Sequence, residues 1–228
     1  MDAAGQPRTT GETVDTWEMV VIHRWFKREF AQMPALVRGV APSDHGNVRY
    51  VADFVEMMAG LLHHHHVGED EMLWPRLLER VGGLDSELVQ RMEKQHDVVG
   101  KALEQIDELL PQWRQRADAA TRDELADVLE GMSGPLIEHL GEEESKVLPL
   151  VSVYITQAEW DALGRNGASS MPKGAKGFDT IGMILQETTP QERAGFLRLL
   201  PAPVRLLHKL VGAGIHQRAK VRRREIAA

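Results

Sequence analysis

The chain contains no cysteine among its 228 residues. Disulfide bonds, zinc sites built on thiolates and iron–sulfur clusters are therefore excluded, and any metal ion must be held by nitrogen and oxygen ligands. Hydrophobic residues still make up 43% of the chain, which is enough for a globular domain with a real core.

Long apolar runs are absent as well. No stretch of about eighteen consecutive apolar residues occurs, so no membrane-spanning helix is predicted. The first sixteen residues are polar and lack the apolar core of a signal peptide, and we therefore expect a cytoplasmic protein. A glycine-rich phosphate loop and a Gly-x-Ser-x-Gly nucleophile motif are also missing, which argues against the enzyme classes that depend on them.

The net charge of −7 conceals two regions of opposite sign. Residues 189–228 hold nine Lys or Arg against two Glu, a net charge of +7, whereas the rest of the chain has 18 basic and 32 acidic residues, a net charge of −14. An acidic body and a basic tail need separate explanations.

Apolar residues recur at three- and four-residue steps in four long segments, which is the spacing of amphipathic helices. The first segment runs to about Val40, the second ends at Gly82-Gly83, and the third opens near Asp85. The fourth follows residues 121–124, whose Thr and Glu have the spacing of a capping box. Short loops between them predict an all-α fold, an up-down-up-down antiparallel four-helix bundle with a helical C-terminal appendage.

The composition changes beyond Tyr154. Thr156 begins another capping-box pattern, and Thr189-Pro190 places a Thr at a helix cap and a Pro in the first turn. Residues 164–177 between them are rich in Gly, Ser, Lys and Pro, which predicts a mobile linker. We therefore expect four parts: a flexible N-terminus at 1–15, the four-helix bundle at 16–155, a short helix and linker at 156–177, and a basic helical extension at 178–228.

A histidine is followed by a glutamate four residues later in two places, His65 with Glu69 and His139 with Glu143, and each copy has a proline ten residues after the histidine. Residues four apart on a helix share a face, so each copy presents an imidazole and a carboxylate to one point. Two such pairs facing each other would make a metal site.

His23 and His96 occupy the inward stripes of the other two helices. Counting about 1.5 Å of rise per residue from the helix ends brings the four histidines and two glutamates to one level of the bundle. A single histidine on an apolar face is usually a hydrogen-bonded core residue, but two buried carboxylates without a cation would cost several kcal/mol each. The six residues together predict a metal site: His23, His65, Glu69, His96, His139 and Glu143.

These motifs, together with His23-Arg24-Trp25-Phe26, resemble those of the hemerythrin-like family, in its branch with His-His-Glu cation-binding motifs. The resemblance covers roughly residues 15–155. It implies two non-haem Fe ions joined by an oxo or hydroxo bridge. It further implies that His23 and His65 ligate one iron, that His96 and His139 ligate the other, and that both glutamates bridge them. Imidazole and carboxylate ligands suit iron. Ferritin-like sites and zinc proteases need other spacings, which the chain lacks.

One position departs from the oxygen-carrying members of that family, because Gly100 stands where they have a second histidine four residues after His96. A missing ligand would leave one iron with an open position, which favours peroxide or nitric oxide chemistry over reversible dioxygen storage. His64, His66 or Tyr50 could compensate, but neighbouring helical residues point about 100° apart, and none is expected to do so. Tyr154 is a still weaker candidate.

Several acidic neighbours of these ligands, Asp70, Glu142 and Glu144, could orient the imidazoles, although a solvated acidic face is the favoured interpretation. The basic tail is expected to dock on the acidic body, with an anionic membrane or an acidic protein as the alternative partner and nucleic acid disfavoured. His208 and His216 are not expected to be metal ligands.

Three functions remain open from the sequence. The first is a cytoplasmic di-iron protein that binds or reacts with dioxygen, hydrogen peroxide or nitric oxide, with catalase- or peroxidase-like activity as one form. The second is a module that senses iron or oxygen and signals through its basic extension. The third is a structural bundle without metal, in which the two glutamates would be dispensable.

Overall fold

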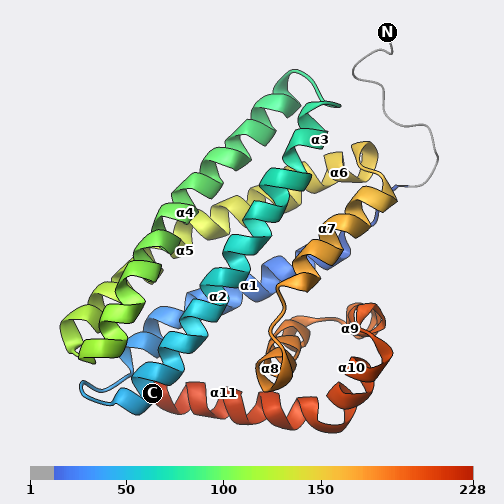
Figure 1. The fold of residues 1–228 in the computed structure, drawn as a ribbon. Coiled ribbons are helices and arrows are strands. Elements are labelled where there is room, and N and C mark those ends of the chain that lie inside the picture. The colour runs from blue at the N-terminus through green and yellow to red at the C-terminus, as the bar shows by residue number, and fades with distance from the viewer. Residues whose placement is uncertain (1–12, 228) are drawn as a thin grey trace.

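The computed structural model describes residues 13–227, and within them every secondary-structure element is a helix. This confirms the predicted all-α class. Four of the helices are long: α1 (Trp17–Arg38), α2 (His45–Met72), α4 (Leu84–Arg116) and α5 (Ala119–Glu142). Helix α5 packs against α1 and α4, and α2 packs against α4, so the four run side by side (Figure 1).

Two helix boundaries differ from the prediction. The predicted second helix breaks at Leu73, and a short helix, α3 (Trp74–Leu78), restarts with Pro75 in its first turn, where a missing N–H has no cost. The predicted capping box at Thr121 was wrong, because α5 begins two residues earlier and Asp118 accepts the backbone N–H of Thr121 at 2.7 Å. Thr121 lies inside the helix and is buried.

Helix α5 does not end at the metal motif. It continues into a π-helical turn, η1 (Glu143–Val147), and then α6 (Leu148–Tyr154). A π-helical turn shifts the register of the side chains that follow, and such turns are frequent at functional sites.

The apolar core consists of two clusters with the histidines and glutamates between them. On α2, the larger cluster ends at Leu62, and the smaller one begins at Leu73, directly after the helix; on α4, the smaller ends at Met92 and the larger begins at Val99. The polar level predicted by counting helical rise therefore interrupts an otherwise continuous core.

The C-terminal part consists of five further α-helices: α7 (Gln157–Ser169), α8 (Gly174–Ile184), α9 (Pro190–Leu199), α10 (Ala202–Leu207) and α11 (Ala213–Ala227). A 3-10 turn, η2 (Leu185–Glu187), joins α8 to α9, and a π-helical turn, η3 (His208–Gly212), joins α10 to α11. The capping box predicted at Thr156 is present, and Thr189, predicted as a helix cap before Pro190, also forms a capping box. The predicted mobile linker at 164–177 is largely helical, since only residues 170–173 separate α7 from α8.

The C-terminal helices dock on the long helices, as expected for the basic tail. Helix α7 packs on α2, and α8, α9 and α11 pack on α1 (Figure 1). The backbone oxygen of Ile226 approaches Gly39 so closely that any side chain there would clash. Arg223 of α11 binds Asp179 of α8 at 2.6 Å with the predicted polarity, but Arg24 of α1 binds Glu192 of α9 at 2.5 Å with the opposite one.

Tyr50 contacts this docked tail and not the predicted metal site. The guanidinium carbon of Arg222 lies 3.7 Å from the centre of its ring. Of the predicted flexible N-terminus, residues 1–12 lie outside the described residues, whereas Val14 is buried and donates its backbone N–H to Ser152 at 3.3 Å. No helix within the described part of the chain is long and apolar enough to cross a membrane.

Candidate metal centre

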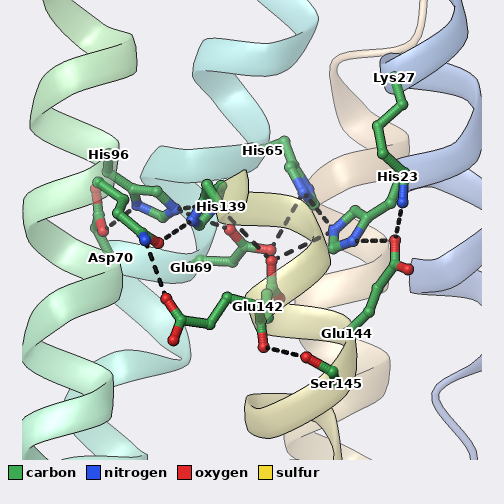
Figure 2. Close-up of polar contacts among 12 residues, drawn as sticks. His23, Lys27, His65, Glu69, Asp70, His96, His139, Glu142, Glu144 and Ser145 are labelled. Carbon is green, nitrogen blue, oxygen red and sulfur yellow. Dashed lines mark hydrogen bonds and ion pairs between the residues drawn. The ribbon is translucent and has the colours of Figure 1, made fainter. Parts of the chain in front are cut away.

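The six predicted ligands lie on α1, α2, α4, α5 and η1 and converge between these helices; Figure 2 labels all of them except Glu143. Five of them are buried, and the side chain of His65 is 13% exposed. Together with one further histidine they form two groups, in each of which the candidate ligand atoms lie within 4.8 Å of one another.

The first group holds His23, His65, Glu69 and Glu143. The Nε2 atoms of His23 and His65 are 3.2 Å apart. A carboxylate oxygen lies beside each ring: Glu143 Oε2 is 3.4 Å from His23 Nε2, and Glu69 Oε1 is 3.3 Å from His65 Nε2.

The second group holds His66, His96 and His139. The Nε2 atoms of His96 and His139 are 3.0 Å apart, and the ring of His66 stacks on that of His96 with their centres 4.1 Å apart. His66, which was not expected to serve as a ligand, thus lies within reach of the second group. His65 and His66 point in different directions, as neighbours on a helix do, but each direction leads to a different group.

The two glutamates lie between the groups. Glu69 places Oε1 by His65 and Oε2 3.5 Å from Nε2 of His96. Glu143 Oε2 is 3.9 Å from Nε2 of His139 on one side and reaches His23 on the other. Each carboxylate therefore stands where it could bridge two ions, one in each group.

Three of the imidazoles are oriented by oxygen acceptors at Nδ1. His23 Nδ1 lies 3.2 Å from Glu144, His96 Nδ1 lies 2.7 Å from Asp70, and His139 Nδ1 lies 3.2 Å from the side-chain oxygen of Gln95. Because these oxygens accept, Nδ1 carries the proton and Nε2 of each neutral ring offers a lone pair to the centre. The orienting role, which the sequence did not favour, is the one seen for Asp70 and Glu144.

The acceptors are themselves held in place. Lys27 donates to Glu144 at 2.8 Å (Figure 2). Gln95 donates its amide N–H to Glu142 at 3.0 Å, and Arg91 also binds Glu142. Burial alone would raise the pKa of Glu144, but hydrogen bonds from His23 and Lys27 hold that pKa below its usual value, so the carboxylate stays an acceptor.

Several polar atoms of the centre have no hydrogen-bond partner within residues 13–227: both oxygens of Glu69, both of Glu143, and Nε2 of His66. Such buried groups are costly unless another partner binds them. Two nitrogens that each bind one metal ion at about 2.1 Å and at right angles would be about 3.0 Å apart, close to the separations seen here. Cations between these atoms would satisfy them all.

The electrostatics also fit a cation. Burial, followed by the charge of Glu143, raises the pKa of Glu69 well above its usual value, and burial raises that of Glu143. Burial, followed by repulsion from neighbouring histidines, lowers the pKa of His139 to about 2. Metal ions require deprotonated carboxylates and neutral imidazoles, and they supply the positive charge that the buried acids lack.

His64, the other histidine considered as an extra ligand, does not face the centre. Its Nε2 lies 2.9 Å from the backbone oxygen of Asn166 on α7. His66 and Gln95 are the two residues of the site that the sequence interpretation did not select. The sequence held a signal for His66, because it directly follows His65. The role of Gln95 could be recognised only from the packing of α4 against α5.

The fold and the site thus define an all-helical protein. Its buried histidines and glutamates are paired and able to hold metal ions. The family model of the hemerythrin HHE cation-binding domain matches residues 15–151, and the chain belongs to that family. No curated protein and no solved structure matched the chain.

Proposed function

We propose that α1, α2, α4 and α5 form an up-down-up-down four-helix bundle that holds two iron ions joined by an oxo or hydroxo bridge. His23 and His65 would ligate one ion, His66, His96 and His139 the other, and Glu69 and Glu143 would bridge both. The unpartnered oxygens and the facing Nε2 atoms support this assignment. Iron would supply redox and Lewis-acid chemistry for dioxygen, hydrogen peroxide or nitric oxide.

The unequal number of imidazoles in the two groups carries the proposal of reactivity. The sequence predicted an open position because of Gly100, but His66 fills that place, so the open position belongs on the side of His23 and His65, which has two imidazoles. His65 is also the one ligand in this set with a partly exposed side chain. The group with fewer imidazoles is thus also the group with a slightly exposed side chain, which favours the binding of small molecules there.

The surrounding residues restrict access. Phe26 packs against His65 with ring centres 5.4 Å apart, and Trp74, which is fully buried, packs against His96 at 5.8 Å. These side chains exclude bulky substrates and leave the centre suited to diatomic molecules and peroxide. Catalase- or peroxidase-like turnover is the enzymatic form of this proposal.

Anaerobic iron-loaded protein, mixed with hydrogen peroxide, nitric oxide or dioxygen in a stopped-flow instrument, tests the proposal. We expect a rapid change in the absorption of the iron centre with at least one of the three, and none in the double variant Glu69→Gln/Glu143→Gln. A fully iron-loaded protein that responds to none of them would exclude this function.

A second candidate, iron or oxygen sensing through the C-terminal extension, rests on contacts made by neighbours of the ligands. Arg24, next to His23, binds Glu192 of α9, and Arg28, one turn further, donates to the backbone oxygen of Met183 at 2.7 Å. His64, next to His65, contacts α7. A shift of the ligand-bearing turns on iron binding would therefore reach the extension directly.

Limited proteolysis of residues 164–228 with and without iron tests this candidate. Sensing predicts a change in the cleavage rate on iron loading, and the change should shrink in Arg24→Gln, which removes the ion pair with Glu192. Equal cleavage of the two wild-type states would leave the extension a passive appendage.

A further inference from the structure

Five large apolar side chains are exposed along one short segment of the extension, at the end of α9 and through α10 and η3. We name them the apolar ridge: Leu199, Leu206, Leu207, Leu210 and Val211. Leu206 is 59% exposed and Leu210 is 68% exposed. They make up half of the large exposed hydrophobic residues in the part of the chain that the structure describes.

Four members of the ridge lie on the exposed side of the segment formed by α10, η3 and the start of α11. Leu206, Leu207, Leu210 and Val211 are exposed and are interspersed in the sequence with buried residues. Buried residues His208, Gly212 and His216 fall on the opposite side, where they pack against α8. The ridge residues are therefore open to solvent, and the segment that carries them forms the corner where α10 leads through η3 into α11 (Figure 1).

The charge around the ridge has one sign. Between Arg193 and Arg224 the chain has nine Lys or Arg and no Asp or Glu. Arg198, Arg205 and Lys209 are exposed beside the ridge. By contrast, Arg223 is partly buried and held by Asp179 at 2.6 Å, so it belongs to the packing of the extension.

Contacts within the protein hold the corner that carries the ridge in place. His216 and Arg223 of α11 both bind Asp179 of α8, and the far end of α11 abuts Gly39 of α1. Docking on the long helices thus uses one side of the extension and leaves the ridge and its flanking cations free.

We propose that the apolar ridge and its flanking cations bind the surface of an anionic lipid bilayer, with the leucines entering the boundary of the headgroups and the cations contacting lipid phosphates. Exposed leucines next to a cluster of Lys and Arg are what an interfacial helix needs, because burial of apolar area and attraction to anionic lipids act together. The proposal is independent of the chemistry at the metal centre.

The other occupants fit less well. A second copy docked ridge to ridge would bring two strongly basic segments together. Nucleic acid would use the cations but would leave the leucines in water, since phosphate contacts dominate such binding. An acidic protein remains the competing partner, and the experiment separates it from lipid.

Flotation of the full iron-loaded protein with vesicles tests the proposal. We expect binding to mixed phosphatidylcholine–phosphatidylglycerol vesicles and at least about tenfold weaker binding to pure phosphatidylcholine. Leu206→Glu/Leu210→Glu should weaken binding to the mixed vesicles at least about tenfold. The matched control is Leu84→Glu/Val98→Glu, which changes two exposed apolar residues of α4 and the net charge equally, and it should bind like wild type.

A labelling experiment covers the case in which the double variant does not fold. The chain has no cysteine, so Leu210→Cys and Leu84→Cys each provide a single thiol for an environment-sensitive fluorophore. Mixed vesicles should shift the emission of the label at position 210 to shorter wavelength and leave that at position 84 unchanged. Absence of wild-type flotation, equal loss in the two double variants, or leucine-dependent binding to polyglutamate in place of vesicles would overturn the proposal.

Discussion

The Nε2 atoms of His96 and His139 face each other at 3.0 Å, while the Nδ1 atom of each ring lies within hydrogen-bond distance of a side-chain oxygen. If Nδ1 of both rings carries the proton, neither Nε2 can donate to the other, and two lone pairs confront each other in a buried site. A cation between them would resolve this repulsion.

His66 should be a ligand and His64 should not. We expect His66→Leu to lose or greatly weaken one of the two metal sites, because it removes one of the three imidazoles of its group, and His64→Leu to keep both. Metal analysis after dialysis checks this. If the two variants retain the same amount of metal, the assignment of His66 to the site is wrong.

Asp70 should matter although it touches no metal. Asp70→Asn removes the carboxylate that orients His96, and we expect metal affinity to fall by about 10- to 100-fold. Glu71→Gln, an exposed neighbour on the same helix, is the control and should bind like wild type. Competition with a chelator measures both affinities, and an effect of equal size in the two variants would point to general electrostatics.

The difference in unfolding temperature between the double variant Glu69→Gln/Glu143→Gln and wild type should change sign when metal is added. Without metal, we expect the variant to unfold at a higher temperature than wild type, because it avoids burying two carboxyl groups that face each other. With iron, wild type should gain stability and the variant should not, since an ion that binds only the folded state stabilises it. Melting curves with and without iron decide, and a variant that gains as much as wild type would contradict the bridging role.

Glu159, which is not part of the metal centre, should make the stability of the folded state depend on pH. Hydrogen bonds from Arg80, then from the backbone and hydroxyl of Thr156, hold its pKa well below the usual value of 4.5. The folded state therefore binds this proton less readily than the unfolded state, and the stabilisation is present above pH 4.5 and is lost as the pH falls through the lowered pKa. Glu159→Gln should be less stable than wild type at pH 7, with a difference that narrows below pH 4.5. Exposed Glu104→Gln should show no such trend in denaturant titrations.

Much of this protein was predictable from sequence periodicity. Helical spacing placed His23, His96 and the two His–Glu pairs at one level, because rise per residue is nearly constant along a helix. His66 was missed because a count of levels treats each helix as facing one point, whereas the candidate ligands form two groups side by side. A capping box also predicted the start of α5 wrongly, since Asp118, three residues before Thr121, was an equally good cap.

The extension was harder to predict. The glycines of residues 164–177 suggested a linker, but α7 and α8 bury apolar residues such as Trp160 and Ile181, and this packing outweighs weak helix propensity. The opposite charges of body and tail predicted docking, which occurs, but most of the Lys and Arg of the tail remain exposed.

Metal analysis of the purified chain, combined with its absorption spectrum, tests the central claim most directly. We predict two irons per chain and the charge-transfer bands of an oxo- or hydroxo-bridged ferric pair. A single zinc ion per chain, without such bands, would contradict the di-iron assignment.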